Sequence, residues 1–523
     1  MARELPIELL ALIASSVALS RDEALNSRGE LPLVSLVPFT TVSRLWQTLF
    51  EPHIYRRLHV YSKEVQGIEY LKGKLTCERL KEITSGPPYR VARRSWIQDL
   101  TYRAVVPHHL KDYTRAALEG YSPDNAFRRA NDRAFSAAIL GLFNVLSSWD
   151  HGSARSSRVS ISLHIRLYGE RKYLPEEQSE PNTEFEEMAW AHTFEYTDGA
   201  TRSVFPYNAK FVSEYPTLSH VSCVSSVSFG RDWVTSDEEN GVWAAAALHI
   251  LQYCNDLKKA SLDLDYYIRP DQVSALQHRR EVVATNLPKV PKSVRTFKCN
   301  WGEEYGWKSN MNAPNVLLNP ARDSLSISLR DLSLQLQELH LDHLRITPDL
   351  FWPSDAGLET KQDLFWPNME VVNISMVPPV DPLGAWLLLP EDRNSSDLDI
   401  LDMDENIWND DLGGSYRNVL DLEAFHNLYI AAGRAARRMP RLRLFRLEHR
   451  AHENQLVELA PEKKKGKPTN SGSLNIDWVS LYGYQPSKEV CEAWGLRPDQ
   501  LEHPHETIWT AKFDTWPPSV DEH

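Results

Sequence analysis

The stretch Leu336-Gln337-Glu338-Leu339-His340-Leu341 carries the pattern that decides the fold of this chain. Its apolar residues Leu336, Leu339 and Leu341 occupy positions i, i+3 and i+5. The last two alternate with polar residues, as in a β-strand that buries one face. The same spacing occurs six more times, at Ile97-Leu100-Tyr102, Val224-Val227-Phe229, Leu257-Ala260-Leu262, Val294-Phe297-Cys299, Met369-Val372-Ile374 and Leu442-Phe445-Leu447. We therefore expect a series of strands, each with one buried face.

Helical stretches lie between these expected strands. Residues 241–255 and 422–439 carry apolar side chains at helical spacing, and each stretch leads into the next strand. The Leu-x-x-Leu-x-Leu pattern is typical of leucine-rich repeats, in which strand–helix units stack into a right-handed coil. The starts at 224, 257, 294, 336 and 369 are 33, 37, 42 and 33 residues apart, against roughly 20–29 in a regular repeat. We expect an α/β solenoid of degenerate repeats with long insertions, with a globular α/β domain as the alternative.

The first fifty residues predict a small helical unit. Leu9, Ile13 and Val17 share one face of a short helix. A second set with this rhythm follows at Val42, Leu45, Trp46 and Leu49. Thr40-Thr41 can cap the second helix, and Pro52 is expected to end it. Because so short a unit buries little core, it should keep apolar surface for a partner.

This stretch resembles an F-box, the helical module that docks a protein onto the Skp-type adaptor of cullin ubiquitin ligases. The matching residues fall where that family has its Leu-Pro start, its first helix and its Val-Ser-x-x-Trp segment. They are Leu5, Pro6, Glu8, Leu9, Leu10, Ile13, Val42, Ser43 and Trp46. The resemblance implies that these residues and Leu49 bind the adaptor, the apolar ones as anchors. The polar segment from Leu19 to Glu30 departs from the family, because it lengthens the gap after the first helix.

Further blocks are similar to fungal F-box proteins with a leucine-rich domain of unknown function. They are residues 137–149 with the strand 159–164, residues 366–370 and residues 431–440. The similarity covers most of the chain from about residue 90 onward. It implies an F-box over residues 1–60 and a degenerate leucine-rich-repeat-like domain over residues 61–523. Polar composition predicts surface loops at about 391–414 and 462–473.

Composition narrows the function classes. A net charge of −13 disfavours binding to nucleic-acid backbones, and no apolar run approaches the ~20 residues of a membrane span. The five cysteines show no metal-type spacing, which fits reduced thiols in the cytoplasm or nucleus. A secretory signal over Leu9 to Val17 is disfavoured, because Glu4 and Glu8 give it the wrong charge.

No catalytic or cofactor motif emerges. The sequences G-x-S-x-G, H-E-x-x-H and G-x-G-x-x-G do not occur. Asp402, Asp404 and Asn406 are spaced as in a calcium loop, but Ile407 and Gly413 stand where Gly and Glu are needed. We therefore expect no enzymatic activity, no cofactor and no metal.

Two other polar stretches have simple interpretations. His503-Pro504-His505-Glu506 is interpreted as a polar tail, since no complementary metal ligands accompany it. The basic run from Arg434 to Arg450 is more typical of a solvated face than of a phosphate-binding patch.

The expected function is substrate recognition in a Skp/cullin/F-box ubiquitin ligase. The N-terminal helices would bind the adaptor and, through it, a cullin, and the repeat domain would hold a target protein on its strand face or loops. The target itself is not readable from the residues. The alternative is a non-ligase interaction scaffold whose helical cap only closes the solenoid, which the segment from Leu19 to Glu30 favours.

Overall fold

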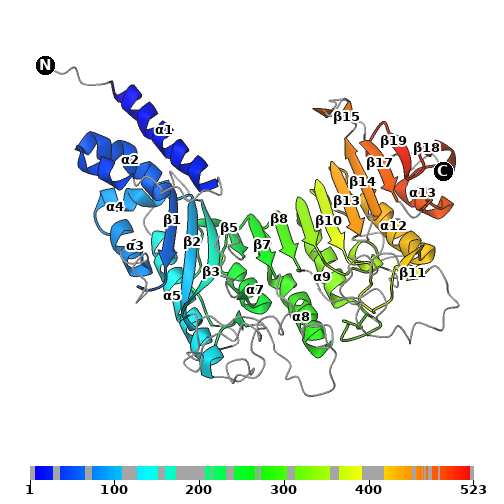
Figure 1. The fold of residues 1–523 in the computed structure, drawn as a ribbon, viewed down its shortest axis with the longest axis horizontal. Helices are drawn as coiled ribbons and strands as arrows, with labels where there is room; N and C mark the ends of the chain where they lie inside the picture. Colours follow the sequence, from blue (N-terminus) through cyan, green and yellow to red (C-terminus); the bar gives the residue numbers. More distant parts are fainter. Residues whose placement is uncertain are drawn as a thin grey trace, which may run out of the picture. The chain divides into compact units, whose positions relative to one another are not determined.

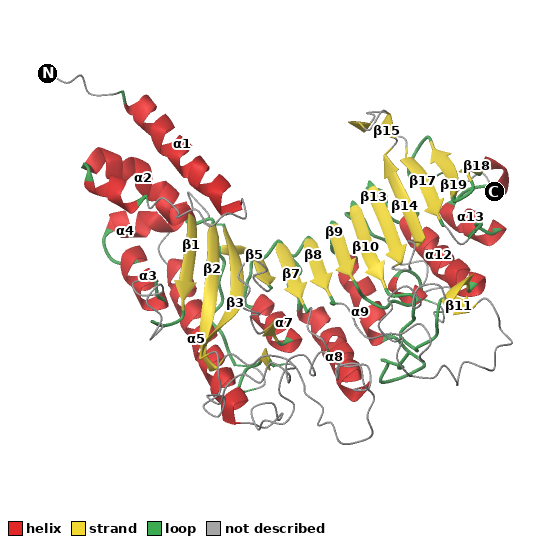
Figure 2. Cartoon of the chain, viewed as in Figure 1, coloured by secondary structure: helices red, strands yellow, loops and turns green. Residues whose placement is uncertain are grey.

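The structure is a computed structural model of the 523-residue chain. It describes residues 6–26, 36–64, 74–108, 126–150, 160–171, 207–213, 216–230, 241–264, 268, 273–302, 313–353, 364–390, 417–449, 455–461, 463–464, 467–468, 474–480 and 483–518. These residues form two compact units, one up to Lys258 and one from Lys259 onward. Each unit combines helices with strands (Figures 1 and 2).

Three helices open the first unit. They are α1 (Ile7–Asn26), the 3₁₀ helix η1 (Val37–Thr41) and α2 (Arg44–Arg56). Ala14, Leu36 and Phe50 are buried at their centre. The rings of Phe39, Trp46 and Phe50 stack beside this centre, with centroids 4.8–5.9 Å apart. The three helices therefore share a small apolar core, with α1 alongside α2 in Figure 1.

Two predicted helix ends were wrong. α1 is long rather than short, since it continues from Leu19 to Asn26. That stretch contains neither glycine nor proline, so nothing local stops the helix. Pro52 lies inside α2, which ends only at Arg56. Ile54 packs against the helical core, and this tertiary contact helps to offset the backbone hydrogen bond that proline cannot donate.

The start of α2 also differs from the prediction. Ser43 is the capping residue, because its hydroxyl accepts the backbone N–H of Trp46 at 3.3 Å. The hydroxyls of Thr40 and Thr41 instead donate to backbone carbonyls of η1, each at 2.7 Å.

Four parallel strands form the sheet of the first unit, in the order given. They are β1 (Arg57–Tyr61), β2 (Asp99–His108), β3 (Ile161–Arg171) and β5 (Val224–Phe229). The helices of this part are α3 (Cys77–Thr84), α4 (Pro88–Ala92), η3 (Arg93–Trp96), α5 (Ala126–Asp150) and α7 (Ala244–Gln252). A short parallel pair, β4 (Asn208–Ala209) and β6 (Gly241–Val242), belongs to the same unit. The Tyr102 hydroxyl donates to the carbonyl of Ala138 at 2.8 Å and ties β2 to α5.

The second unit begins with five parallel strands. They are β7 (Lys259–Asp263), β8 (Thr296–Asn300), β9 (Glu338–Asp342), β10 (Val371–Val377) and β13 (Leu444–His449). The helices are α8 (Val273–Asn286), η6 (Leu287–Lys289), α9 (Ser324–Ser333), η7 (Pro348–Leu350), α12 (Leu422–Ala436), α13 (Lys488–Trp494) and η9 (Pro498–Gln500). Figure 2 shows α8, α9 and α12 following the strands on the same side.

The seven apolar triplets are confirmed as strand positions. The second and third residues of each triplet lie in one of the parallel strands, and the first lies in the strand or shortly before it. All 21 side chains of the seven triplets are buried. The alternating partners of these residues are partly exposed, as a strand with one covered face requires. The α/β class and a mostly parallel strand arrangement are thereby confirmed.

Antiparallel strands, which the repeat pattern did not predict, end the second unit. They are β14 (Gln455–Pro461), β17 (Leu474–Val479), β19 (Ile508–Phe513) and β18 (Glu502–His505). Five residues separate β13 from β14, whereas a parallel crossover needs about a dozen or more. The prediction of a polar tail at residues 503–506 was wrong, because His503 lies on the strand β18. Its ring stacks on the ring of Trp509, with centroids 4.3 Å apart.

Two short pairs complete the described strands. β11 (Leu388–Pro390) pairs with β12 (Arg417–Leu420), and β15 (Lys463–Lys464) pairs with β16 (Lys467–Pro468) within the predicted loop 462–473. The predicted loop 391–414, with its calcium-like spacing, lies outside the described residues. The domain boundary after residue 60 stays a prediction, and β1 spans that position.

Candidate docking surface of the N-terminal helices

α1 carries apolar residues on two of its faces. Leu10 and Ala14 pack toward the helical core and are buried. Leu9 and Ile13 each precede one of these residues and so lie about 100° around the helix. Their side chains are 46% and 41% exposed. The helix therefore needs one apolar face for its own packing and leaves a second apolar face to solvent.

The residues that begin α1 are exposed. The carbonyl of Pro6 accepts the backbone N–H groups of Leu9 and Leu10 at 3.0 and 3.2 Å. Glu8 lies in the first turn, where its negative charge suits the positive end of the helix. Leu5, which also belongs to the predicted site, lies outside the described residues.

In the second predicted segment, from Val42 to Leu49, some residues are exposed and others are packed against the helical core. Val42 is 62% exposed at the junction of η1 and α2. Ser43 caps α2, whereas Trp46 and Leu49 are partly buried against the helical core. Among the expected apolar anchors, Leu9, Ile13 and Val42 thus face solvent, while Leu10 and Trp46 help to hold the helices together.

Exposed apolar side chains are concentrated in this segment. Fifteen large apolar side chains are exposed among the described residues, and eight of them lie within residues 7–45. These eight are Ile7, Leu9, Leu12, Ile13, Leu19, Val37, Val42 and Leu45. Such a concentration is typical of a surface that another protein covers.

α2 is attached to η3 and to the residue before β2 by contacts that the sequence pattern did not reveal. Arg93 Nη2 lies 2.8 Å from Glu51 Oε1, and both side chains are mostly buried. The Arg93 guanidinium also lies over the ring of Tyr55 at 5.0 Å, and Arg56 Nε donates to Gln98 Oε1 at 2.9 Å. These partners are about forty residues apart in the chain, so only the fold brings them together.

The strand face predicted to hold a target is polar in the second unit. In register across β7, β8, β9, β10 and β13 it presents Ser261, Lys298, His340, Asn373 and Arg446. Neighbouring strands are joined on this face by hydrogen bonds from Asn300 to Asp263 and from Ser375 to Asp342, each 3.1 Å. This face therefore satisfies many of its own polar groups.

The basic run between Arg434 and Arg450 has several internal partners. Arg443 Nη2 lies 2.7 Å from Glu370 Oε2, and Arg446 Nη2 lies 2.8 Å from Glu448 Oε2. Arg437 donates to the backbone carbonyl of Glu492 at 3.4 Å. These contacts favour a structural role for the run over phosphate binding.

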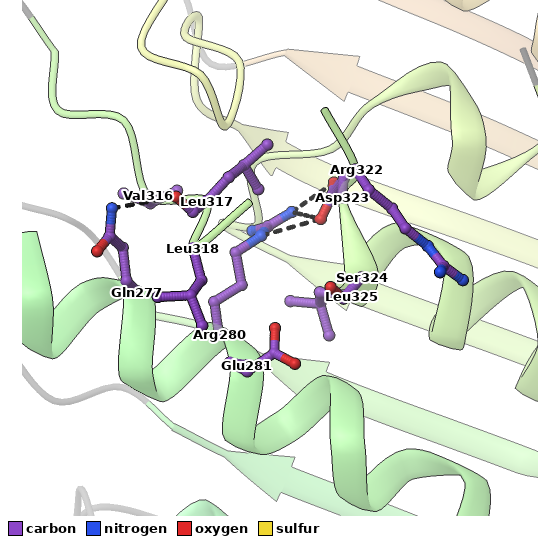
Figure 3. A pocket seen from close by; sticks show the side chains of 10 residues that line it. All are labelled: Gln277, Arg280, Glu281, Val316, Leu317, Leu318, Arg322, Asp323, Ser324 and Leu325. Atoms are coloured by element: carbon purple, nitrogen blue, oxygen red, sulfur yellow. Dashed lines mark hydrogen bonds and ion pairs between the residues drawn. The ribbon is translucent and has the colours of Figure 1, made fainter. Parts of the chain in front are cut away.

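A small pocket lies beside the start of α9 (Figure 3). Arg280 Nη2 in its wall lies 2.7 Å from Asp323 Oδ2, and these side chains are 5% and 1% exposed. Asp323 also accepts the backbone N–H of Ser326 and caps α9. Burial alone would raise the pKa of Asp323, but the Arg280 guanidinium and the hydrogen bonds lower it. We interpret the Arg280–Asp323 ion pair in its wall as a structural contact that joins α8 to α9.

The described residues contain neither a metal-type cluster nor an exposed cysteine. Within them, no group of three or more His, Cys, Asp or Glu side chains is arranged to hold a metal ion. All five cysteines are buried, and burial raises the pKa of Cys77 to about 11 and that of Cys299 to about 12. A thiol that stays protonated is a poor nucleophile. No helix in the described ranges combines the length and apolar character needed to cross a membrane.

No family model matches the chain, and no curated protein matches it either. The function is therefore inferred from the residues and their geometry.

Proposed function

We propose that this chain is the substrate-recognition subunit of a Skp/cullin/F-box ubiquitin ligase. The N-terminal helices would dock the adaptor, and the strand layers would hold a target protein. The observation that carries the proposal is the concentration of eight exposed large apolar side chains within residues 7–45. It coincides with the segment that resembles an F-box in sequence.

The arrangement of α1 supports a docking role. A helix that only capped the strand layer would need one apolar face, whereas α1 has Leu10 and Ala14 buried and Leu9 and Ile13 exposed. Burying one large apolar side chain in an interface contributes about 1.5–3 kcal/mol before the costs of association. Several such side chains on neighbouring helices are enough to anchor a partner.

The subunit would act by proximity rather than by chemistry of its own. A target held beside a cullin-bound transferring enzyme meets it at a high effective concentration. The Glu51–Arg93 ion pair and the Arg56–Gln98 hydrogen bond link α2 to η3 and to the residue before β2. They would limit the movement of a bound target relative to the adaptor.

Co-purification of the adaptor tests the proposal. The variant Leu9→Ser/Ile13→Ser/Val42→Ser removes three exposed apolar side chains and leaves the buried Leu10, Ala14 and Phe50 in place. We expect at least a tenfold loss of adaptor recovered with the tagged full chain, since each truncated anchor can cost ~2 kcal/mol or more. Thermal unfolding should stay close to that of the wild type.

A matched control separates docking from general surface effects. Leu318→Ser/Leu383→Ser removes exposed apolar side chains of the second unit and should leave adaptor recovery unchanged. Undiminished recovery with the Leu9, Ile13 and Val42 triple variant would contradict the docking role. A wild-type chain that recovers no adaptor would favour the scaffold alternative.

A further inference from the structure

A group of aromatic rings joins β13 and α12 to the loop that leads into α13. We call Phe425, Tyr429, His449 and Tyr484 the aromatic cluster. The Tyr484 ring packs against Tyr429 and Phe425, with centroids 5.2 and 6.5 Å apart, and His449 packs edge-on against Phe425 at 5.1 Å. All four side chains are at most 3% exposed. The cluster therefore lies in the buried layer between the strands and the last two helices.

Two polar groups of the aromatic cluster are buried without a hydrogen-bond partner. In the part of the chain that the structure describes, neither ring nitrogen of His449 has a partner, and the Tyr484 hydroxyl has none either. A polar group that loses its water and gains no hydrogen bond opposes its own burial. Opening of the cluster would return water to these atoms, so the closed arrangement is less favoured than its ring packing alone would make it.

Acid acts on this balance through His449. An accessible histidine takes up a proton near pH ~6.5, whereas burial lowers the pKa of His449 to about 3. The ring is therefore neutral while the cluster is closed and can be protonated once water reaches it. Because the folded pKa is lowered, the closed state is fully favoured above pH ~6.5 and loses ground as the pH falls below that value.

The groups that surround His449 do not offset this effect. Burial raises the pKa of Tyr429 and of Tyr484, so both phenols stay neutral between pH 5 and pH 7. Val377 and Gln455, which pair with His449 from β10 and β14, are uncharged, and Glu448 points to the other strand face toward Arg446. The remaining titratable or charged neighbours of the cluster are His426 on α12 and Lys488, Glu489, Cys491 and Glu492 on α13.

The aromatic cluster holds one end of a short segment, residues 483–496, against α12. The backbone N–H of Tyr484 donates to the Ser480 hydroxyl at 3.1 Å, and the Tyr484 ring enters the cluster. At the other end, Trp494 Nε1 donates to the carbonyl of Tyr429 at 3.1 Å. α13, which lies between these two contacts, packs beside α12 (Figure 1). The segment is thus attached to the rest of the second unit largely through buried aromatic side chains.

We infer that the aromatic cluster is an acid-sensitive latch, which holds residues 483–496 on α12 while His449 is neutral and releases them when His449 is protonated. Release exposes Trp494 and the face of α12 that carries Tyr429. Local opening of this kind is a normal property of segments that are held by few contacts. The latch belongs to the C-terminal part of the second unit and does not rest on the proposed function.

Hydrogen exchange of the full chain at pH 7 and pH 5 tests the latch, with each rate corrected for the intrinsic exchange rate at that pH. We expect the opening equilibrium of residues 483–496 to rise roughly 25-fold at pH 5, because only the open state protonates His449 in this range. At pH 5 this segment should also open at least about tenfold more often than α9 of the same unit. Equal opening of both would indicate global unfolding and would overturn the latch.

Substitutions assign the effect to one histidine. His449→Phe keeps a ring and His449→Gln keeps a polar side chain, and neither titrates, so the rise at pH 5 should fall below about twofold in both. Each variant is compared with itself at the two pH values, so a change in its stability at pH 7 cancels. Tyr484→Phe removes the hydroxyl that has no partner and should make opening rarer at both pH values while the rise remains.

His426→Gln is the matched control. His426 is partly exposed and contacts the same segment, with its Nε2 3.4 Å from the carbonyl of Gln485. This variant should keep the roughly 25-fold rise. Loss of the rise in His426→Gln, or its persistence in both His449 variants, would overturn the latch. A rise below about threefold in the wild type would overturn it as well.

Discussion

Both units pair arginines with acids, and the first unit also places two arginines on paired positions of neighbouring strands. Arg103 and Arg166 face each other across β2 and β3. In the second unit Arg446 lies 2.8 Å from Glu448 and 3.8 Å from Glu458, and Arg280 is buried against Asp323. In the second unit the charges of these arginines are thus matched by acids within the fold.

The largest effect is expected where a matched charge is buried. Arg280→Ala leaves the Asp323 carboxylate at the start of α9 without its ion-pair partner. We expect the free energy of unfolding at pH 7 to fall by about 3–5 kcal/mol, measured by urea denaturation.

The pH dependence provides the control for Arg280→Ala. The lowered pKa of Asp323 gives the wild type stability that is present above pH ~4 and is lost as the pH falls through the folded pKa. The deficit of the variant should therefore shrink toward pH 3. A loss below 1 kcal/mol at pH 7 would show that the pair is not matched as described.

The histidines of the two units also differ, and the expected effect on stability is smaller. His59 and His164 have hydrogen-bond partners on the face of the first unit. His449 is 1% exposed in the second unit, both ring nitrogens lack a partner among the described residues, and burial lowers its pKa to about 3.

The unfolded state protonates His449 near pH 6.5, whereas the folded state keeps it neutral to about pH 3. Stability should therefore fall as the pH drops below 6.5, by at most about 1.4 kcal/mol per pH unit, with no effect above it. His449→Phe should reduce this slope in urea denaturation at pH 7 and pH 5. An unchanged slope would assign the acid sensitivity to other groups.

A partly exposed matched charge should matter less. Arg446→Gln leaves Glu448 and Glu458 without their arginine on the face of the second unit. We expect a loss of about 0.5–1 kcal/mol, because solvent screens these pairs. Urea denaturation at low and high salt measures it, and the difference from the wild type should narrow at high salt.

The smallest effect is expected for Arg166 on β3. Its side chain is partly exposed, so in Arg166→Gln the free energy of unfolding should stay within about 0.5 kcal/mol of the wild type. Thermal unfolding of the full chain measures it. A loss above 1 kcal/mol would mean that Arg166 stabilises the fold.

Local patterns predicted the strands well and the helix ends poorly. The apolar triplets were sufficient because alternation along a strand is visible within six residues. The length of α1 and the continuation of α2 through Pro52 depend on packing that no short window contains. The return from β13 to β14 was missed because the repeat pattern assumes a helix after every strand.

The candidate docking site was only partly predictable. The apolar rhythm located the residues of α1, but it could not distinguish the buried Leu10 from the exposed Leu9. That distinction depends on where α2 lies. No spacing signal links Arg103 to Arg166, since the register of β2 and β3 alone makes them neighbours.

The sequence by itself determined that parallel strands alternate with helices. It also determined that the N-terminal helices carry more apolar residues than their own packing uses. Both properties follow from the order of apolar and polar residues along short segments. Only the tertiary structure decided which apolar side chains stay exposed and which charges meet. The Arg280–Asp323 ion pair and the strand register that pairs Arg103 with Arg166 join residues far apart in the chain, because helix packing and strand pairing bring them together.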